Sequence, residues 1–195
     1  MNTPNRPSNP CISIGIPSIQ LIFINLTIEK LNNLPPVFRQ KGYVTVGNTP
    51  PLNDGASTLV LISKEKLNDL DQKPLGKIVD FGYGNVEPEY MGIGPIPAIR
   101  NLLDKTGLKK DDIDFYEINE AQAQQVLFCI KGLELDINKI NVHGGAIALG
   151  HPPGMTGARL ILTALYTLKK SGKKYAICSL CAGGGTGMAI LLEKI

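Results

Sequence analysis

The sequence is poor in cysteine and has no long, uninterrupted apolar run. Four cysteines in 195 residues are too few for a small disulfide-linked scaffold. The most apolar stretch, residues 12–28, is interrupted by Pro17, Gln20 and Asn25, so it falls short of the roughly 20 apolar residues that a membrane span needs. It also shows no small-residue cleavage site, and we expect no secretory signal. We expect a reducing compartment, the cytoplasm or an organelle matrix, and no membrane partner.

The chain also lacks a strong excess of charge of either sign. Its 20 Lys and Arg against 17 Asp and Glu give a formal net charge of +3, far from the basic surface of a nucleic-acid-binding protein. Hydrophobic residues make up 43% of the sequence and charged residues 19%, which is typical of a globular domain with a core. The length indicates one domain or a large part of a two-domain protein, with no nucleic-acid partner.

The N-terminal part of the sequence is irregular. Residues 1–26 are punctuated by Pro and Asn and then become apolar without helical or strand periodicity, so this tail is left unassigned. A regular pattern begins at residue 27. It predicts a helix over residues 28–33, a stop at residues 34–36, and an apolar strand or helix over residues 59–62.

From residue 73 onward, strand-like and helix-like segments alternate, which indicates a layered α/β fold. Residues 157–170 place their apolar side chains on one helical face and end in two lysines before Gly172. The glycine-rich residues 183–187 predict a β-hairpin. We therefore expect an α/β fold with a mixed, five-stranded sheet and helices packed on both faces. The expected strands are residues 77–81, 113–118, 175–180 and 188–192, and the expected helices are residues 95–105, 121–131 and 157–170.

Two glycine-rich clusters lie beside reactive side chains. The first, residues 141–152, contains both histidines of the chain, His143 and His151, shortly before an expected helix N-terminus, whose free N–H groups favour negative charge. The second, residues 181–185, begins with a cysteine. We favour His151 as a functional residue because Gly150 and Pro152 fix its backbone, and we expect a structural role for His143.

A metal or redox site is a weaker interpretation of the same residues. Cys178 and Cys181 with the two histidines would supply a Cys2His2 set, but seven residues separate the histidines, against a usual gap of about three to five. Residues i and i+3 of a strand face opposite sides, so we expect Cys178 in the core and Cys181 at a site. The cysteine pair ends a strand, whereas a redox pair needs a helix N-terminus. The Gly145 to Gly150 spacing fits a phosphate loop, but a histidine replaces its lysine. We expect no metal.

The remaining combination is a thiol with an imidazole. Cys181 precedes glycines whose N–H groups can bind an oxyanion, and Asn119 and Glu120 follow a strand. This set is typical of acyl transfer. A thiol that titrates at about 8.5 can take or give a proton near neutral pH, and His151 can accept a proton or polarise a carbonyl.

At these motifs the sequence resembles the thiolase family, which comprises acetyl-CoA acetyltransferases and 3-ketoacyl-CoA thiolases, and specifically its C-terminal half. The resemblance extends from Thr27 to Glu193. It implies that residues 27–72 end the N-terminal domain and residues 73–195 form the C-terminal domain of a thiolase-like half. The motifs that carry it, in chain order, are Leu34-Pro35-Pro36-Val37-Phe38, Gly47-Asn48, Asn53-Asp54-Gly55-Ala56, Met91-Gly92-Ile93-Gly94-Pro95, Asn119-Glu120-Ala121, Gly144-Gly145-Ala146, Gly150-His151-Pro152 and Cys181-Ala182-Gly183-Gly184-Gly185.

The resemblance implies a role for each matching residue. His151 would activate a nucleophilic cysteine and, with a water held by Asn119, bind the thioester oxygen. Cys181 would carry a proton between substrate and solvent, and the Gly183 N–H would belong to a second oxyanion hole. Met91 would line the acyl and pantetheine pocket. Plainer alternatives are that Met91 is a core residue and that Asn119 only caps the helix that follows it.

The implied activity is acyl transfer on coenzyme A thioesters. It would condense acetyl-CoA to acetoacetyl-CoA or cleave 3-ketoacyl-CoA by thiolysis, with acyl-CoA and CoA as substrates and no cofactor. The implied protein partner is a thiolase N-terminal half or further copies of the chain, because one half alone would leave apolar helix faces uncovered. The alternative is a non-catalytic, truncated remnant or an interaction module.

Four departures from the family pattern affect this expectation. Family members are about twice as long, and their acylated cysteine lies in a Cys-x-Ser-Gly context that Cys11 does not match. We expect the chain alone to be nearly inert, because removing a nucleophile lowers kcat by a factor on the order of 10^6. Pro50 cannot donate a backbone hydrogen bond to pantetheine. Gln122 places a polar group beside the acyl pocket, and Pro153 replaces an aliphatic residue.

Overall fold

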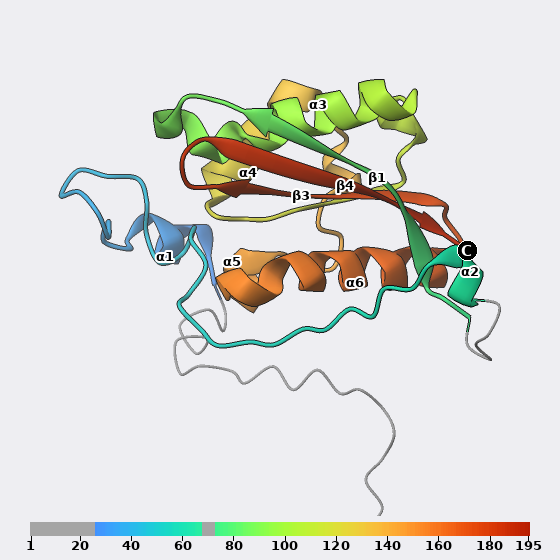
Figure 1. Ribbon diagram of the computed structural model, residues 1–195. Coiled ribbons are helices and arrows are strands. Elements are labelled where there is room, and N and C mark those ends of the chain that lie inside the picture. The colour runs from blue at the N-terminus through green and yellow to red at the C-terminus, as the bar shows by residue number, and fades with distance from the viewer. Residues whose placement is uncertain (1–25, 68–72) are drawn as a thin grey trace, which may run out of the picture.

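A four-stranded mixed sheet lies at the centre of the protein, with helices on both faces (Figure 1). The computed structural model describes residues 26–67 and 73–195, so almost all of the unassigned tail lies outside the described residues. The strands are β1 (Gly76–Asn85), β2 (Phe115–Ile118), β3 (Tyr175–Ala182) and β4 (Thr186–Lys194). The α-helices are α1 (Ile28–Asn32), α2 (Lys64–Leu67), α3 (Pro95–Thr106), α4 (Ala123–Leu133), α5 (Ala146–Leu149) and α6 (Pro153–Ser171), and the 3-10 helices are η2 (Pro88–Ile93), η3 (Lys110–Asp112) and η4 (Ile137–Lys139). The expected α/β class is confirmed.

The sheet runs in the order β1-β4-β3-β2, with β4 antiparallel to both of its neighbours and β2 parallel to β3. The expected hairpin is confirmed, because β3 and β4 pair up to Ala182 and Thr186. Its turn requires glycine at Gly184 and Gly185, whose φ angles are 86° and 89°. The expectation of a fifth strand is wrong for the described residues. Beside β2 there is only a single parallel bridge, which joins Tyr116 to Ile140.

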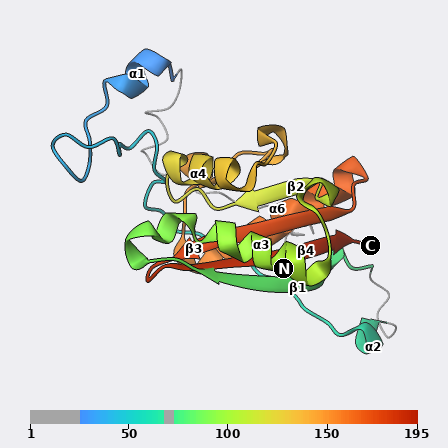
Figure 2. The ribbon, with the colours of Figure 1, turned by 90° about the horizontal axis from the view of Figure 1, so that it is seen from above.

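Two hydrophobic cores lie between the sheet and the helices on its two faces. Strand β2 contributes side chains to both cores, because successive residues of a strand point to opposite faces. Helices α3 and α4 cover one face of the sheet (Figures 1 and 2), where Tyr116 and Ile118 are buried. Helix α6 covers the other face and buries Leu160 and Leu168 against β3 and β4. Each such leucine contributes roughly 1.5–3 kcal/mol. The helix α6 begins with Pro153 and ends at Gly172, a left-handed cap with φ 71°.

The sequence patterns placed some elements wrongly. The expectation of a strand or helix over residues 59–62 is wrong, because this segment is extended without regular hydrogen bonding, and Val60 is 90% exposed. The helix expected from residue 121 begins at Ala123. The short helices η2 and α5 were not expected at all. No helix in the described part of the chain is long and apolar enough to cross a bilayer.

Candidate active site

Asn119 and Cys181 lie at the carboxyl ends of adjacent parallel strands. Asn119 directly follows β2, and its backbone N–H donates a hydrogen bond of 2.9 Å to the Ser179 carbonyl on β3. Cys181 lies two residues further along β3. In open α/β sheets, ligands bind outside the carboxyl ends of parallel strands. The fold therefore brings these two sequence-predicted residues to the edge of the sheet where a site is expected.

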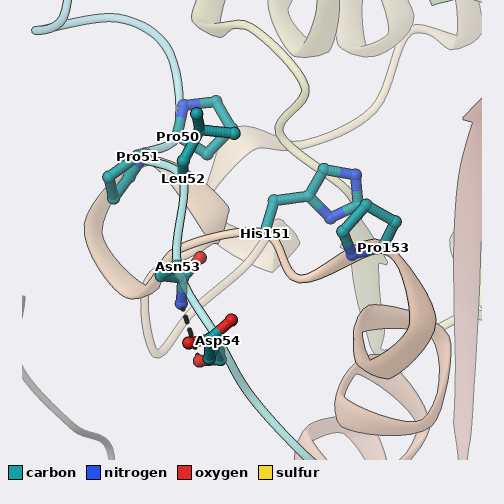
Figure 3. A pocket seen from close by; sticks show the side chains of 7 residues that line it. All are labelled: Pro50, Pro51, Leu52, Asn53, Asp54, His151 and Pro153. Atoms are coloured by element: carbon teal, nitrogen blue, oxygen red, sulfur yellow. Dashed lines mark hydrogen bonds between the residues drawn. The ribbon is translucent and has the colours of Figure 1, made fainter.

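His151 reaches the site from the turn between α5 and α6. The turn needs glycine at Gly150, whose φ is 90°, and a Cβ at this position would collide with the side chain of Asn53. Asn53 belongs to the extended segment of residues 50–54, which with His151 and Pro153 lines an open pocket of about 540 Å³. Figure 3 shows His151 between this segment and the start of α6.

Hydrogen bonds fix the tautomer of His151. The Thr156 hydroxyl donates to the Pro152 carbonyl oxygen at 2.9 Å, so it is left as an acceptor for His151 Nδ1, 2.7 Å away. Nδ1 therefore carries the hydrogen, and the lone pair lies on Nε2. The Asn119 amide nitrogen lies 3.5 Å from that Nε2. This arrangement leaves Nε2 as a proton acceptor next to an amide donor.

The two titratable groups are shifted in opposite directions. Burial lowers the pKa of His151, and the charge of Arg159 lowers it further, so the imidazole is neutral at neutral pH. Burial raises the pKa of the Cys181 thiol, so this thiol keeps its proton at the same pH. Among residues 26–67 and 73–195, no hydrogen bond joins the Cys181 thiol to the His151 imidazole. Their cooperation stays a prediction.

Glu120 and Asn141 hold the chain that leads to His151. The Glu120 carboxylate accepts hydrogen bonds of 3.0 Å from the Ile147 N–H, in the first turn of α5, and from the Asn141 amide. A Cβ at Gly145 would collide with this carboxylate. Asn141, with φ 44°, also bonds both backbone groups of Ile118 at 2.9 Å. Glu120 thus has a structural role, beside the amide of Asn119 that faces the histidine.

Met91 lines a second pocket, of about 550 Å³, with Ala121, Gln122 and Phe128. Met91 is 36% exposed, so it is not a core residue. The polar side chain of Gln122 does stand in this pocket, and its Oε1 accepts a hydrogen bond of 2.8 Å from Gln124. Whether an acyl group occupies this pocket stays a prediction.

The remaining residues differ in exposure: some lie on the surface and others in the core. Gly183 is exposed in the hairpin turn, and a Cβ there would meet nothing within 4 Å. His143 is exposed on the chain before α5. Cys178 is 1% exposed, in the core between α6 and the sheet, as expected, and Cys129 on α4 is buried in the core on the other face. In the part of the chain that the structure describes, no group of three or more His, Cys, Asp and Glu side chains is placed to hold a metal.

Three residues of this region, Thr156, Glu117 and Arg159, were not predicted from the sequence. Thr156 was hidden because it is the fifth residue after the histidine, inside the first turns of α6, where it is fully buried. Glu117 and Arg159 form a buried pair, with 3.8 Å between Oε2 and Nη1. A charged residue in the middle of an apolar strand, as Glu117 is, was the one available signal.

Comparisons with known proteins show which family the chain is similar to. Residues 72–194 match the family described as thiolase, C-terminal domain, and residues 21–65 match the thiolase N-terminal domain. An acetyl-CoA acetyltransferase of Syntrophomonas wolfei is 45% identical over 171 residues, which are 87% of this chain and 43% of that protein. The mitochondrial 3-ketoacyl-CoA thiolase of Bos taurus is 46% identical over 168 residues, 86% of this chain and 42% of that protein.

Solved structures give the same result. The crystal structure of the Bacillus anthracis acetyl-CoA acetyltransferase has a TM-score of 0.85 and 47% identity over 88% of this chain and 43% of that one. Human mitochondrial 3-ketoacyl-CoA thiolase in complex with CoA has a TM-score of 0.79 and 40% identity over the same shares. The chain thus spans less than half the length of these relatives. Over the part that it does span, sequence and fold agree, and the chain belongs to the thiolase family.

Proposed function

We propose that this chain supplies the proton-transferring side of a thiolase site that acts on coenzyme A thioesters. One observation carries the proposal: His151 Nδ1 lies 2.7 Å from a Thr156 hydroxyl that donates to the Pro152 carbonyl, and Nε2 lies beside the Asn119 amide, which together assign the lone pair to Nε2. This geometry prepares a neutral general base. The nucleophilic cysteine would come from a thiolase N-terminal half or from a longer form of the chain.

The reaction would begin at Nε2 of His151. This nitrogen takes the proton of the nucleophilic cysteine, and the resulting thiolate attacks the carbonyl carbon of the thioester. The new Nε2–H then donates a hydrogen bond to the carbonyl oxygen as negative charge develops there, together with a water on Asn119. The CoA thiolate that leaves takes its proton from the Cys181 thiol. The Gly183 N–H would stabilise the oxyanion of the second substrate.

The proposed substrates are acetyl-CoA for condensation, and 3-ketoacyl-CoA with CoA for thiolysis, with no further cofactor. The relatives named as acetyl-CoA acetyltransferase and 3-ketoacyl-CoA thiolase support both directions, and the human relative solved with CoA supports coenzyme A as a ligand. The proposed location is the cytoplasm or an organelle matrix, and the name of the Bos taurus relative, which calls that protein mitochondrial, supports the second.

Complementation tests this function. The chain is mixed with the part of the Syntrophomonas wolfei relative that it does not cover, and thiolysis of acetoacetyl-CoA by CoA is followed by absorbance. We expect turnover in the mixture and none with either part alone. His151→Ala should abolish it, whereas His143→Ala, at the other and exposed histidine, should not. Turnover by the chain alone would contradict the expected inertness, and an active His151→Ala mixture would contradict the proposed base.

A non-catalytic interaction module is the second candidate. It is favoured by the exposed apolar residues on α4, where Leu127 is 56% and Phe128 63% exposed. The same surface would fit the absent thiolase half or a second copy of the chain. A mixture that forms a stable complex in sedimentation, yet neither turns over acetoacetyl-CoA nor binds CoA, would favour this candidate.

A further inference from the structure

The pocket that Met91 lines has an amide-rich wall. The side chains of Gln122, Gln124 and Gln125, at the start of α4, all line it, opposite the apolar side chains of Met91 and Ile93. Ligand pockets are mostly apolar, and the few polar groups in them fix the orientation and identity of the ligand. The hydrogen bonds of the three glutamines therefore show which of their amide groups are available to a ligand.

Gln125 is occupied within the fold. It is 6% exposed, and its Oε1 accepts a hydrogen bond of 3.2 Å from the Ala121 N–H. Its Nε2 donates to the Cys129 thiol, with 3.5 Å between the nitrogen and the sulfur. Both polar atoms of Gln125 thus hold the first turns of α4 in place.

Gln122 and Gln124 are bonded to each other and keep free polar atoms. Gln124 Nε2 donates to Gln122 Oε1 at 2.8 Å, and both side chains are partly buried. Gln122 is the N-cap residue of α4, yet its side chain makes no capping hydrogen bond. In the described part of the chain, no hydrogen bond is found for Gln122 Nε2 or Gln124 Oε1. The pair therefore presents one amide donor and one amide acceptor, and turning over both amides only exchanges the two roles.

A hydroxyl group fits this pair better than a carboxylate does. A hydroxyl accepts one hydrogen bond and donates another, whereas a carboxylate only accepts. The carboxyl group of Glu89 lines the same pocket, and a second carboxylate beside it would be repelled. Met91 and Ile93 offer apolar contact to the methylene groups of an alkyl chain. The pocket also begins next to the candidate site, because Ala121, which lines it, is two residues after Asn119.

We propose that Gln122 and Gln124 are specificity-determining residues that select acyl thioesters carrying a hydroxyl group on the alkyl chain. Gln122 donates to the oxygen of this hydroxyl, and Gln124 accepts its hydrogen. The transfer of the acyl group rests on the proposed function, whereas recognition of the hydroxyl by the two amides does not.

NMR of the intact chain tests the recognition without turnover. The side-chain amide signals are followed during titration with hexanoyl-CoA or with its ω-hydroxy derivative. The hydroxylated probe should move the signals of Gln122 and Gln124 further than hexanoyl-CoA does. The signals of Gln40, which is exposed and outside the pocket, should stay in place with both probes. Equal shifts with the two probes, or none at the pair, would overturn the proposal.

Kinetics of the complementation mixture test the selectivity. For ω-hydroxy-3-ketohexanoyl-CoA, kcat/KM should exceed that for 3-ketohexanoyl-CoA by about 10-fold, the effect of one to two neutral hydrogen bonds. Gln122→Met removes the amide from an unbranched side chain of similar length, and the ratio should fall to about 1. Gln124→Met should lower the ratio as well, and the matched control Gln40→Met should leave it unchanged.

The two measurements separate this proposal from the proposed function. A mixture that turns over both substrates with the same ratio in the wild type and in Gln122→Met would reject the selectivity and retain the function. An inactive mixture, together with amide signals that move only with the hydroxylated probe, would reject the function and retain the hydroxyl-binding pair.

Discussion

Replacing Thr156 by valine should destabilise the protein and release the His151 tautomer. Thr156 is fully buried, and valine keeps its shape while removing the hydroxyl. The hydroxyl makes two hydrogen bonds, to the Pro152 carbonyl oxygen at 2.9 Å and with His151 Nδ1 at 2.7 Å. Without it, the imidazole has no acceptor for the Nδ1 hydrogen, and the alternative tautomer with the hydrogen on Nε2 becomes populated.

The magnitude follows from these contacts. Two lost hydrogen bonds of about 1 kcal/mol each predict that Thr156→Val lowers the free energy of unfolding by about 2 kcal/mol. The matched control, Thr156→Ser, keeps the hydroxyl and loses one buried methyl, about 0.8 kcal/mol. Urea denaturation measures both, and nitrogen-15 NMR of the imidazole reports the tautomer. If Thr156→Val is as stable as Thr156→Ser and keeps the wild-type nitrogen shifts, the role of Thr156 in holding the His151 tautomer is refuted.

Three further predictions follow from the same structure. Gly150→Ala should lower the free energy of unfolding by about 1–3 kcal/mol, because φ is 90° and the added methyl group meets Asn53. The control Gly157→Ala, at a helical position with open space, should be neutral or stabilising by up to about 1 kcal/mol in thermal unfolding. Equal unfolding midpoints for the two variants would contradict this prediction. Burial raises the pKa of Glu117 from 4.5 to about 7. The contribution of its protonated form to stability is therefore complete below pH 4.5 and is lost as pH rises through 7. The Glu117→Gln variant should lack this loss of stability, and wild-type and variant curves of stability against pH that run parallel would refute the prediction. Leu168→Ala should cost about 2–5 kcal/mol in urea denaturation, because Leu168 is fully buried between α6 and the sheet; a cost below about 1 kcal/mol would contradict that packing.

The parts of the fold that the sequence predicted correctly are those specified by local chemistry. The turn of the β3–β4 hairpin needs positive φ at Gly184 and Gly185, and glycine is the residue that supplies it. Helix α6 has an apolar face within its own residues and a glycine cap directly after them. The apolar residues 59–62, by contrast, predicted an element that does not form, because an apolar run becomes a strand or a helix only against a partner surface.

The site divides in the same way. His151 and Asn119 could be found from motifs, because glycines and proline mark the turn and the strand end around them. Arg159 could not, since its partner Glu117 is on another element far back in the chain, and an arginine on a helix usually indicates a solvated face. The four-residue helix α5 was likewise missed, because its first turn is held by the distant Glu120.

The opposite pKa shifts of the two reactive groups are the physical basis of the proposed chemistry. An acid and a base that work at one pH need environments that separate their pKa values. Burial is the main cause here, since it disfavours the charged form of each group, which is the cation of His151 and the anion of Cys181, and the charge of Arg159 lowers the pKa of His151 further. At neutral pH the imidazole is therefore in its neutral form and can accept a proton, whereas the thiol keeps its proton. A thiol brought to Nε2 would find the acceptor it needs, and a departing thiolate would find a donor on the neighbouring strand end.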